Sequence, residues 1–369
     1  MVIIVAVATQ CIDENTSAPG SQPSASANSF SQFAGSETCS GCHKDIYDKH
    51  LNTAHFLTSR PALEKYIKGS FAADSNSYSF NPKLLARMEK RKDSFFQVAY
   101  TNGIESRAER FDIVVGSSVK GQSYLHWRSS YLAQLPISYF EPTHEWSNSP
   151  GYANDLLFDK PITSRCLECH ATFAQKISAE NARPELFHPN QIIYGVDCEK
   201  CHGAAAKHVQ FHSSNPSDTA AKFIVNPANL SRQQNLDLCA LCHGGRINKT
   251  KPSFSFTVGQ QLRDYFSIDT AGRDARSIDV HGNQFGLMAA SQCFKESNLT
   301  CNSCHNPHEK GKGDLAVFSS RCMNCHTAGH EKVCGLTAST GAVLSKNCID
   351  CHMPIWRSEE RRVGKECRS

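Results

Sequence analysis

Fourteen of the 18 cysteines fall into seven copies of one five-residue pattern, in which two cysteines flank two variable residues and a histidine follows directly. Random placement at this composition gives about 0.04 copies, so the pattern has a common chemical cause. The cysteines are Cys39, Cys42, Cys166, Cys169, Cys198, Cys201, Cys239, Cys242, Cys301, Cys304, Cys322, Cys325, Cys348 and Cys351. The histidines are His43, His170, His202, His243, His305, His326 and His352.

This spacing suits the covalent attachment of haem c. Two thiols one helical turn apart can form thioethers with the two vinyl groups of one haem, and the adjacent histidine then reaches the iron. Zinc and disulfides are the alternatives. Zinc knuckles work in pairs, whereas seven is an odd number, and zinc does not need a histidine after every second cysteine. We therefore expect seven covalently bound haem c groups, with the seven motif histidines as proximal iron ligands.

The composition agrees with a core built around cofactors. Only 40% of the residues are hydrophobic, while a charged fraction of 20% and 20 phenylalanines argue against a disordered chain. A net charge of +4 is too small for a nucleic-acid-binding surface, so we expect no nucleic acid partner. No stretch approaches the roughly 20 apolar residues that cross a bilayer.

The sequence resembles the multihaem c-type cytochromes, in particular the group related to the tetrahaem cytochrome of nitrification and to hydroxylamine oxidoreductase. The resemblance extends from about Glu37 to Trp356. Beyond the haem motifs, it includes the stretches CEKCHGAAAKH, CNSCHNPH, KGQSYLHW, YLAQLPISYF and WSNSPGY. The last three are similar to environmental bacterial multihaem proteins whose cytochrome module is often followed by tetratricopeptide repeats.

Ten histidines remain after the proximal ligands are assigned, and methionine is scarce, so histidine should also be the main distal ligand. The resemblance implies that His208 and His308 each ligate the iron of a neighbouring haem. It also implies distal positions near His55, His144 and His281. A distal or a structural role stays open for the others, His50, His126, His188, His212 and His330.

We expect a mostly α-helical and irregular multihaem fold of low secondary-structure content, with a small antiparallel β-subdomain between the first and second motifs. Ser94–Tyr100, the pair Asn102 and Gly103, and the run ending at Val115 predict a β-hairpin. Residues 124–127 and 131–140 predict a second hairpin, in which Pro136 indicates an edge or a bulge. Between the later motifs we expect short helices wrapped on porphyrin.

The expected organisation has five parts. Residues 1–36 form an export signal or lipoprotein leader with a Ser/Pro-rich tether, 37–93 the first haem-binding segment, 94–147 the β-subdomain and 148–356 a six-haem domain. Two processing routes stay open for the leader, ordinary signal-peptide cleavage or a lipid anchor at Cys11. Residues 357–369 resemble a translated sequencing adapter, and we exclude them as an artefact; a genuine basic tail is the alternative.

The expected function is electron transport through mostly bis-histidine, low-potential haems in the periplasm or at the cell surface. One alternative is an oxidoreductase with an open haem that acts on a small nitrogen or sulfur oxyanion, assisted by side chains such as Tyr124, His126, Arg128 and His144. The other is a subunit of a conductive filament or redox assembly. Enzymatic activity stays open, but electron transfer is favoured because no Cys-x-x-Cys-Lys motif is present.

The expected partners are redox proteins, either other cytochromes or a quinol-oxidising membrane complex. Two cysteines, Cys293 and Cys334, fall outside the motifs, the leader and the tail. In an oxidising compartment they form either a disulfide or two free thiols, and the sequence leaves both possibilities open.

Overall fold

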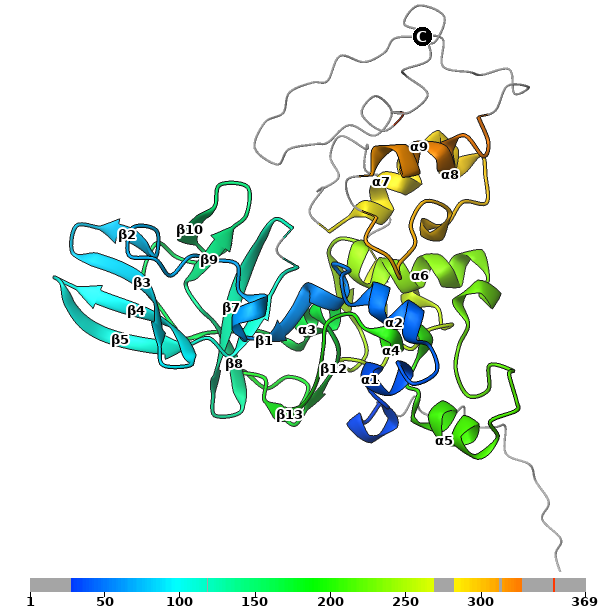
Figure 1. Ribbon diagram of the computed structural model, residues 1–369, viewed down its shortest axis with the longest axis horizontal. Coiled ribbons are helices and arrows are strands. Elements are labelled where there is room, and N and C mark those ends of the chain that lie inside the picture. The colour runs from blue at the N-terminus through cyan, green and yellow to red at the C-terminus, as the bar shows by residue number, and fades with distance from the viewer. Residues whose placement is uncertain (1–27, 118, 269–281, 312–313, 327–347, 349–369) are drawn as a thin grey trace, which may run out of the picture.

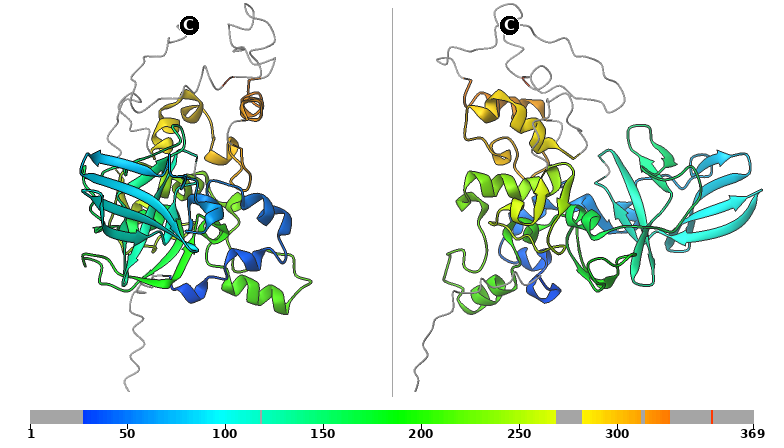
Figure 2. Two further views of the ribbon diagram at one scale, coloured as in Figure 1. Left: turned by 60° about the vertical axis from the view of Figure 1, so that its left-hand side comes forward. Right: turned by 180° about the vertical axis from the view of Figure 1, so that it is seen from behind.

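The computed structural model describes residues 28–117, 119–268, 282–311, 314–326 and 348. These residues form two lobes that lie side by side (Figures 1 and 2). We call residues 59–161 the β lobe, and residues 28–58 with 162–326 the motif lobe. Several predicted features lie outside the described residues, namely the leader, the tail, Cys11, His281, His330, Cys334, Cys351 and His352.

The β lobe contains two antiparallel sheets. In the seven-stranded sheet, β1, β6, β7, β8 and β11 pair in that order, and β9 pairs with both β7 and β10. Its strands are β1 (Ser59–Pro61), β6 (Ile113–Val115), β7 (Gly121–Arg128), β8 (Tyr131–Gln134), β9 (Ile137–Phe140), β10 (Glu145–Asn148) and β11 (Lys160–Pro161). The four-stranded sheet has the sequential order β2 (Ser77–Asn81), β3 (Leu84–Arg91), β4 (Ser94–Thr101) and β5 (Ile104–Arg110).

The first predicted hairpin is confirmed for β4 and β5, which pair in antiparallel register. Its turn residues Asn102 and Gly103 have φ of 51° and 79°, the left-handed conformation that a primed turn needs. After Arg110 the chain leaves this sheet, because β6 pairs with β1 and β7 instead. The second predicted hairpin is confirmed for β7 and β8, and Pro136 separates β8 from β9.

An aromatic core holds the β lobe together. The Phe111 and Tyr124 rings stack with their centroids 4.3 Å apart, and the Trp146 ring lies 5.5 Å from that of Tyr124. Gly69 lies against Trp146, where an added Cβ would come within 2.0 Å of the indole, so only glycine fits. The chain alone therefore completes this core.

The motif lobe is built from short helices and two small hairpins. Its α-helices are α1 (Ser36–Cys39), α2 (Lys44–His50), α3 (Ser164–His170), α4 (Cys198–His202), α5 (Ala206–Ser214), α6 (Arg232–His243), α7 (Gln284–Ala290), α8 (Gln292–Lys295) and α9 (Leu315–Cys322). The hairpins pair β12 (Ala171–Lys176) with β13 (Phe187–Tyr194) and β14 (Ile247–Lys249) with β15 (Phe266–Ile268).

Turns of 3₁₀-helix connect several of these elements. They are η1 (Phe30–Gln32), η2 (Phe56–Thr58), η4 (Pro227–Asn229), η5 (Leu262–Asp264) and η7 (Cys301–Ser303) in the motif lobe, and η3 (Glu64–Tyr66) in the β lobe. Within the described residues, no helix combines the length and the apolar character that crossing a bilayer requires.

The expectation of a mostly helical and irregular fold is wrong. Strands make up 27% of the structure and helices 29%, so the protein is as much β as α. Residues 77–91, which we grouped with the first haem-binding segment, form β2 and β3, in which more exposed positions alternate with less exposed ones. Residues 171–194, between two motifs, also form a hairpin. The error came from treating the segments around the motifs as too short or too irregular for strands.

An apolar interface joins the two lobes. Ile113 and Leu132 of the β lobe pack in one buried cluster with Leu167 of α3 and Phe173 of β12. Because Leu167 lies inside the second Cys-x-x-Cys-His motif, the interface ties that motif directly to the β lobe.

Candidate functional site

The motifs are numbered one to seven along the chain, and motifs one to six, which the structure describes, adopt a common local geometry. The backbone N–H of His43 donates to Cys39, that of His305 to Cys301 and that of His326 to Cys322, over 2.8, 2.9 and 3.1 Å. Motifs two and three lie on α3 and α4, and motif four ends α6. A helical turn from the first cysteine to the histidine places both on one face, as attachment of a single haem requires.

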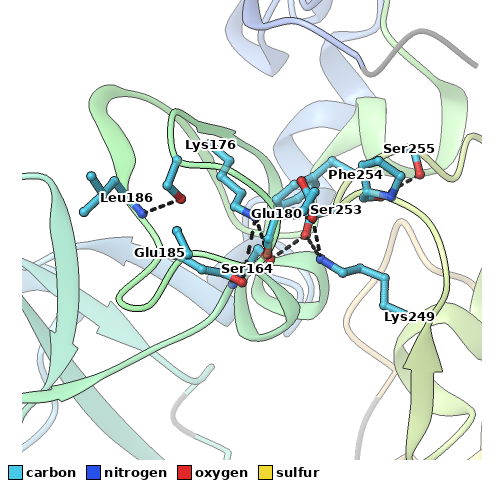
Figure 3. Close-up of polar contacts among 12 residues, drawn as sticks. Ser164, Lys176, Glu180, Glu185, Leu186, Lys249, Ser253, Phe254 and Ser255 are labelled. Carbon is cyan, nitrogen blue, oxygen red and sulfur yellow. Dashed lines mark hydrogen bonds and ion pairs between the residues drawn. The ribbon is translucent and has the colours of Figure 1, made fainter.

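A buried polar network fixes the start of α3 and with it motif two (Figure 3). The Ser164 N–H donates to the carboxylate of Glu185, which is only 3% exposed. The Ser164 hydroxyl contacts that of Ser253, and Lys249 bridges Ser253 and Glu180. Side chains from the β12–β13 hairpin and the 249–255 segment therefore hold motif two in place.

Acidic residues in the motif region serve as buried hydrogen-bond acceptors. Glu199, between the cysteines of motif three, accepts from the backbone N–H groups of Ala34, Gly35 and Ala205, over 2.8, 2.9 and 2.7 Å. Glu168 of motif two accepts from the Phe254 N–H over 2.8 Å. Sequence analysis missed these roles, although the position of both glutamates between the two cysteines of a motif could have indicated them.

Three motif histidines are oriented through one ring nitrogen. His170 Nδ1 lies 2.9 Å from Thr58 Oγ1, His202 Nδ1 2.9 Å from the Val225 carbonyl, and His243 Nδ1 3.0 Å from the Gln284 side-chain oxygen. Metal-binding histidines typically donate their second ring nitrogen to such a partner, which fixes the tautomer and the ring plane. Nε2 of each ring would then be the atom left to ligate a haem iron.

Two motif histidines have a second histidine opposite them. The ring centroids of His202 and His308 lie 6.1 Å apart, and those of His243 and His55 also 6.1 Å apart. Two metal–imidazole bonds of about 2 Å, together with the two ring radii, give a separation of about 6 Å. The centroid spacing of both pairs therefore matches the spacing of two histidines that ligate one iron.

The protonation of these rings agrees with ligation. Burial and the neighbouring His243 lower the pKa of His55 to about 4. Burial also lowers the pKa of His202 and of His308. A neutral imidazole is the form that binds a metal, so all three rings are ready to ligate at neutral pH.

The other assigned histidines are placed less directly. His208 on α5 has Nδ1 2.8 Å from the Lys222 carbonyl, and its ring lies 4.6 Å from that of His212. His144 lies in the turn between β9 and β10, with Nδ1 3.3 Å from the Tyr139 hydroxyl. The structure thus places His144 within the β lobe, not beside His202 or His243.

The side chains considered for an open haem site are engaged inside the β lobe. The Tyr124 and His126 side chains are buried, and His126 Nε2 lies 2.8 Å from the Phe158 carbonyl while its Nδ1 lies 3.2 Å from Glu109. Arg128 forms an ion pair with Asp159. These contacts give the three residues structural roles in the β lobe.

Sequence analysis left His50 open, and the structure buries it. His50 is 7% exposed, its Nε2 lies 3.4 Å from Asp197, and its Nδ1 lies 3.3 Å from the Thr53 hydroxyl. Asp197 caps α4 by accepting from the Cys198 N–H over 2.8 Å. His50 therefore links α2, after motif one, to the start of motif three.

Cysteines of different motifs lie close enough to shift one another's pKa. These pairs relate motifs one and three, two and four, four and five, and six and seven. The pairs are Cys39 with Cys198, Cys169 with Cys242, Cys239 with Cys301, and Cys322 with Cys348. Once haem is attached these sulfurs are thioethers, so the pairs identify which motifs are neighbours.

Two further observations complete the site. Among the described residues, no group of three or more histidine, cysteine, aspartate or glutamate side chains is arranged to hold a metal ion by itself. The Cys293 thiol is exposed, and because Cys334 lies outside the described part of the chain, the disulfide stays a prediction.

Comparisons with known proteins agree with the motif chemistry. A family model described as cytochrome c554 and c-prime matches residues 143–203, which include motifs two and three. The C-type polyheme cytochrome OmcC of Geobacter sulfurreducens is 22% identical over 169 residues, covering 44% of this chain and 20% of that protein. The chain thus spans about a fifth of the length of this curated relative.

Among solved structures, the outer cell wall cytochrome OcwA is similar with a TM-score of 0.43 and 17% identity, covering 64% of this chain and 45% of that one. The family model and the OmcC match are both to c-type cytochromes, and this likeness agrees with the haem-attachment spacing of the motifs.

Proposed function

We propose that the protein carries electrons through seven haem c groups, mostly with histidine on both sides of the iron. The observation that carries this proposal is the 6.1 Å spacing of the His202–His308 and His243–His55 rings. Iron with both axial positions filled has no room for a substrate and can only accept and release electrons. This proposal includes a relation to the nitrification and hydroxylamine oxidoreductase group, as the motifs in the sequence imply.

The chain's own residues have distinct roles in this proposal. The motif cysteines anchor each haem, the motif histidines are the proximal ligands, and His55 and His308 fill two distal positions. The resemblance assigns His208, His281 and His144 to further distal positions. When bound, haem supplies a one-electron couple, and Thr58, Val225 and Gln284 hold the proximal rings that tune it.

The neighbour relations between motifs give the proposed electron path its order. Cysteine pairs link motif one to three, and motif two through four to five. His308, which follows motif five, lies opposite the histidine of motif three, and His55, which follows motif one, lies opposite that of motif four. Five motifs therefore form one connected set, so that an electron entering at any of them can reach the others.

The proposed setting is outside the cytoplasmic membrane. Bacterial haem c attachment takes place there, and the apolar run at residues 2–8 fits an export signal. Other cytochromes or a quinol-oxidising complex are the proposed partners, and a lipid anchor at Cys11 is one of the two proposed processing routes. The five-part division of the chain given above is likewise our proposal.

A second candidate is an oxidoreductase with one open haem. The placement of His144 beside Tyr139 in the β lobe favours it, because this removes one histidine from the vicinity of the motifs described here. A redox assembly is the third candidate. The four-stranded sheet has β5 at its edge, where Ile104 is 73% exposed, but Glu105 and Arg107 on this strand discourage edge pairing.

Magnetic circular dichroism of the ferric protein, combined with mass spectrometry, tests the proposal. We expect seven covalent haems, at least six of them low-spin. A ferric spectrum with a high-spin haem that responds to nitrite or hydroxylamine would replace the carrier with the oxidoreductase. A chain without covalent haem would overturn both.

A further inference from the structure

Arg60 on β1 has an unusual environment at the junction of the two lobes. Its Nε and Nη2 atoms are buried, and neither has a hydrogen-bond partner within the part of the chain that the structure describes. The guanidinium carbon lies 3.0 Å from the centroid of the Phe56 ring. A buried guanidinium with unused donors is costly, and a negative group that accepts from them would recover this cost.

The carboxylate with the strongest electrostatic effect on Arg60, that of Asp197, is already engaged. Asp197 acts electrostatically on Arg60, but its side chain caps α4 through the Cys198 N–H and lies 3.4 Å from His50 Nε2. The other groups that act on Arg60 are the phenols of Tyr47 and Tyr66. None of these three groups takes up the two buried N–H donors.

The backbone leaves room for the guanidinium. Gly195 has φ of +74°, and a Cβ at this position would lie 2.9 Å from Arg60 Nη2. Burial lowers the pKa of Arg60 to about 10, so the side chain remains a cation at neutral pH. The Arg60 guanidinium therefore offers positively charged N–H donors at the lobe junction.

The position of Arg60 relates it to two motifs. The preceding residues Thr58 and Ser59 bond to the His170 ring and the His170 carbonyl, within motif two. Asp197 and Gly195 directly precede motif three. Arg60 thus lies between the chain segments that carry motifs two and three.

We propose that Arg60 binds a planar carboxylate or oxyanion in a bidentate manner at the lobe junction. Arginine offers two parallel donors that match the two oxygens of such a group. The group has two possible sources, a propionate of a haem on a neighbouring motif or a small oxyanion from solution. The inference rests on the haem attachment proposed above.

The test compares the haem-loaded protein with its Arg60→Gln variant. Mass spectrometry first counts the haems in each. Spectroelectrochemical titration between pH 5 and 8 then gives the haem midpoint potentials, and calorimetric titration with sodium formate measures anion binding. The matched control is Arg110→Gln, which removes the same charge from an exposed arginine that pairs with Asp112.

If the bound group is a haem propionate, Arg60→Gln should lower one midpoint potential and make it pH-dependent. The propionate that has lost its arginine then takes up a proton. The wild type would bind no formate in this case. A solution source predicts saturable formate binding that Arg60→Gln weakens at least roughly tenfold. Arg110→Gln should change neither quantity.

Identical potentials at every pH, together with no formate binding, would overturn the proposal and leave Arg60 a packing residue. If Arg60→Gln yields no haem-loaded protein, Arg60→Lys is measured instead. This variant keeps the charge but loses the fork, so we expect the same signatures at smaller size, and unchanged values would overturn the inference. A wild type without haem refutes the proposed function instead, so the two failures are distinguishable.

Discussion

The β lobe and the motif lobe have interiors of different kinds. In the β lobe, Phe111, Tyr124 and Trp146 pack into a continuous aromatic core. The motif lobe has a smaller apolar cluster around Leu241 and Phe266 and shares the interface cluster around Leu167 with the β lobe. Buried carboxylates such as Glu199 and Glu168 hold its chain crossings. The difference teaches that the first interior is complete in the polypeptide, whereas we propose that the apolar faces of haem complete the second.

Removing one haem should have the largest effect and should separate the lobes. We expect Cys198→Ser combined with Cys201→Ser to lose one haem and to reduce amide protection across the motif lobe, because burial against porphyrin is lost. Protection in the β lobe should remain. Mass spectrometry and hydrogen exchange measure the two effects, and Ile177→Ser, at an exposed position of the motif lobe outside the motifs, is the control. Unchanged protection in the motif lobe would contradict the comparison.

Removing a side chain from the aromatic core should weaken the β lobe alone. Trp146→Ala removes a side chain that is only 4% exposed from the aromatic core, and we expect a loss of about 3–5 kcal/mol in the free energy of unfolding. Denaturant titration followed by hydrogen exchange checks this value. Leu157→Ala, at a position that is 53% exposed, should cost far less. A shifted haem spectrum in Trp146→Ala would show that the lobes are not independent.

Distal histidine replacement sharpens the assignment within the motif lobe. His308→Ala should convert one haem to high spin without loss of covalent haem, because the thioethers remain. Electron paramagnetic resonance and mass spectrometry measure both quantities. If the wild type and His308→Ala both keep all their haems and have the same number of low-spin haems, the assignment of His308 is wrong.

The same change at His144 discriminates between the two leading functions. The carrier proposal, in which His144 ligates a haem, expects one additional high-spin haem in His144→Ala. The open-haem alternative expects an unchanged spin count, because His144 then only contacts Tyr139 in the β lobe.

The contrast between the lobes also explains what the sequence could predict. The Cys-x-x-Cys-His spacing specifies covalent chemistry within one helical turn, so local sequence alone was enough to predict the attachment residues, which stay a prediction. The β4–β5 hairpin followed likewise from alternation and from the Asn102–Gly103 turn. Both features depend on residues close together in the chain.

Long-range features could not be predicted in the same way. The pairing of β6 with β1, and the approach of His308 to His202, join segments more than 50 residues apart, and no local pattern encodes them. The prediction of the fold class was wrong for a related reason. The weak alternation at residues 77–91 becomes a sheet only because β4 provides a partner for β3. No local pattern marks Arg60, because Gly195 and Asp197, which lie near its side chain, are far from it along the chain.

The smallest predicted effect tests whether a change in one turn of the β lobe alters the stability of that lobe alone. Gly103 has φ of +79° and an added Cβ would meet no atom within 4 Å, so Gly103→Ala should act only through backbone strain. We expect a loss of about 1 kcal/mol in the free energy of unfolding of the β lobe. Asn102→Gly is the matched control, because glycine adopts the φ of 51° there without strain. Calorimetry should show the loss for Gly103→Ala alone, with both haem spectra unchanged. A destabilised motif lobe in Gly103→Ala would mean that even this remote turn is coupled to the haem sites, and the two-interior comparison would fail.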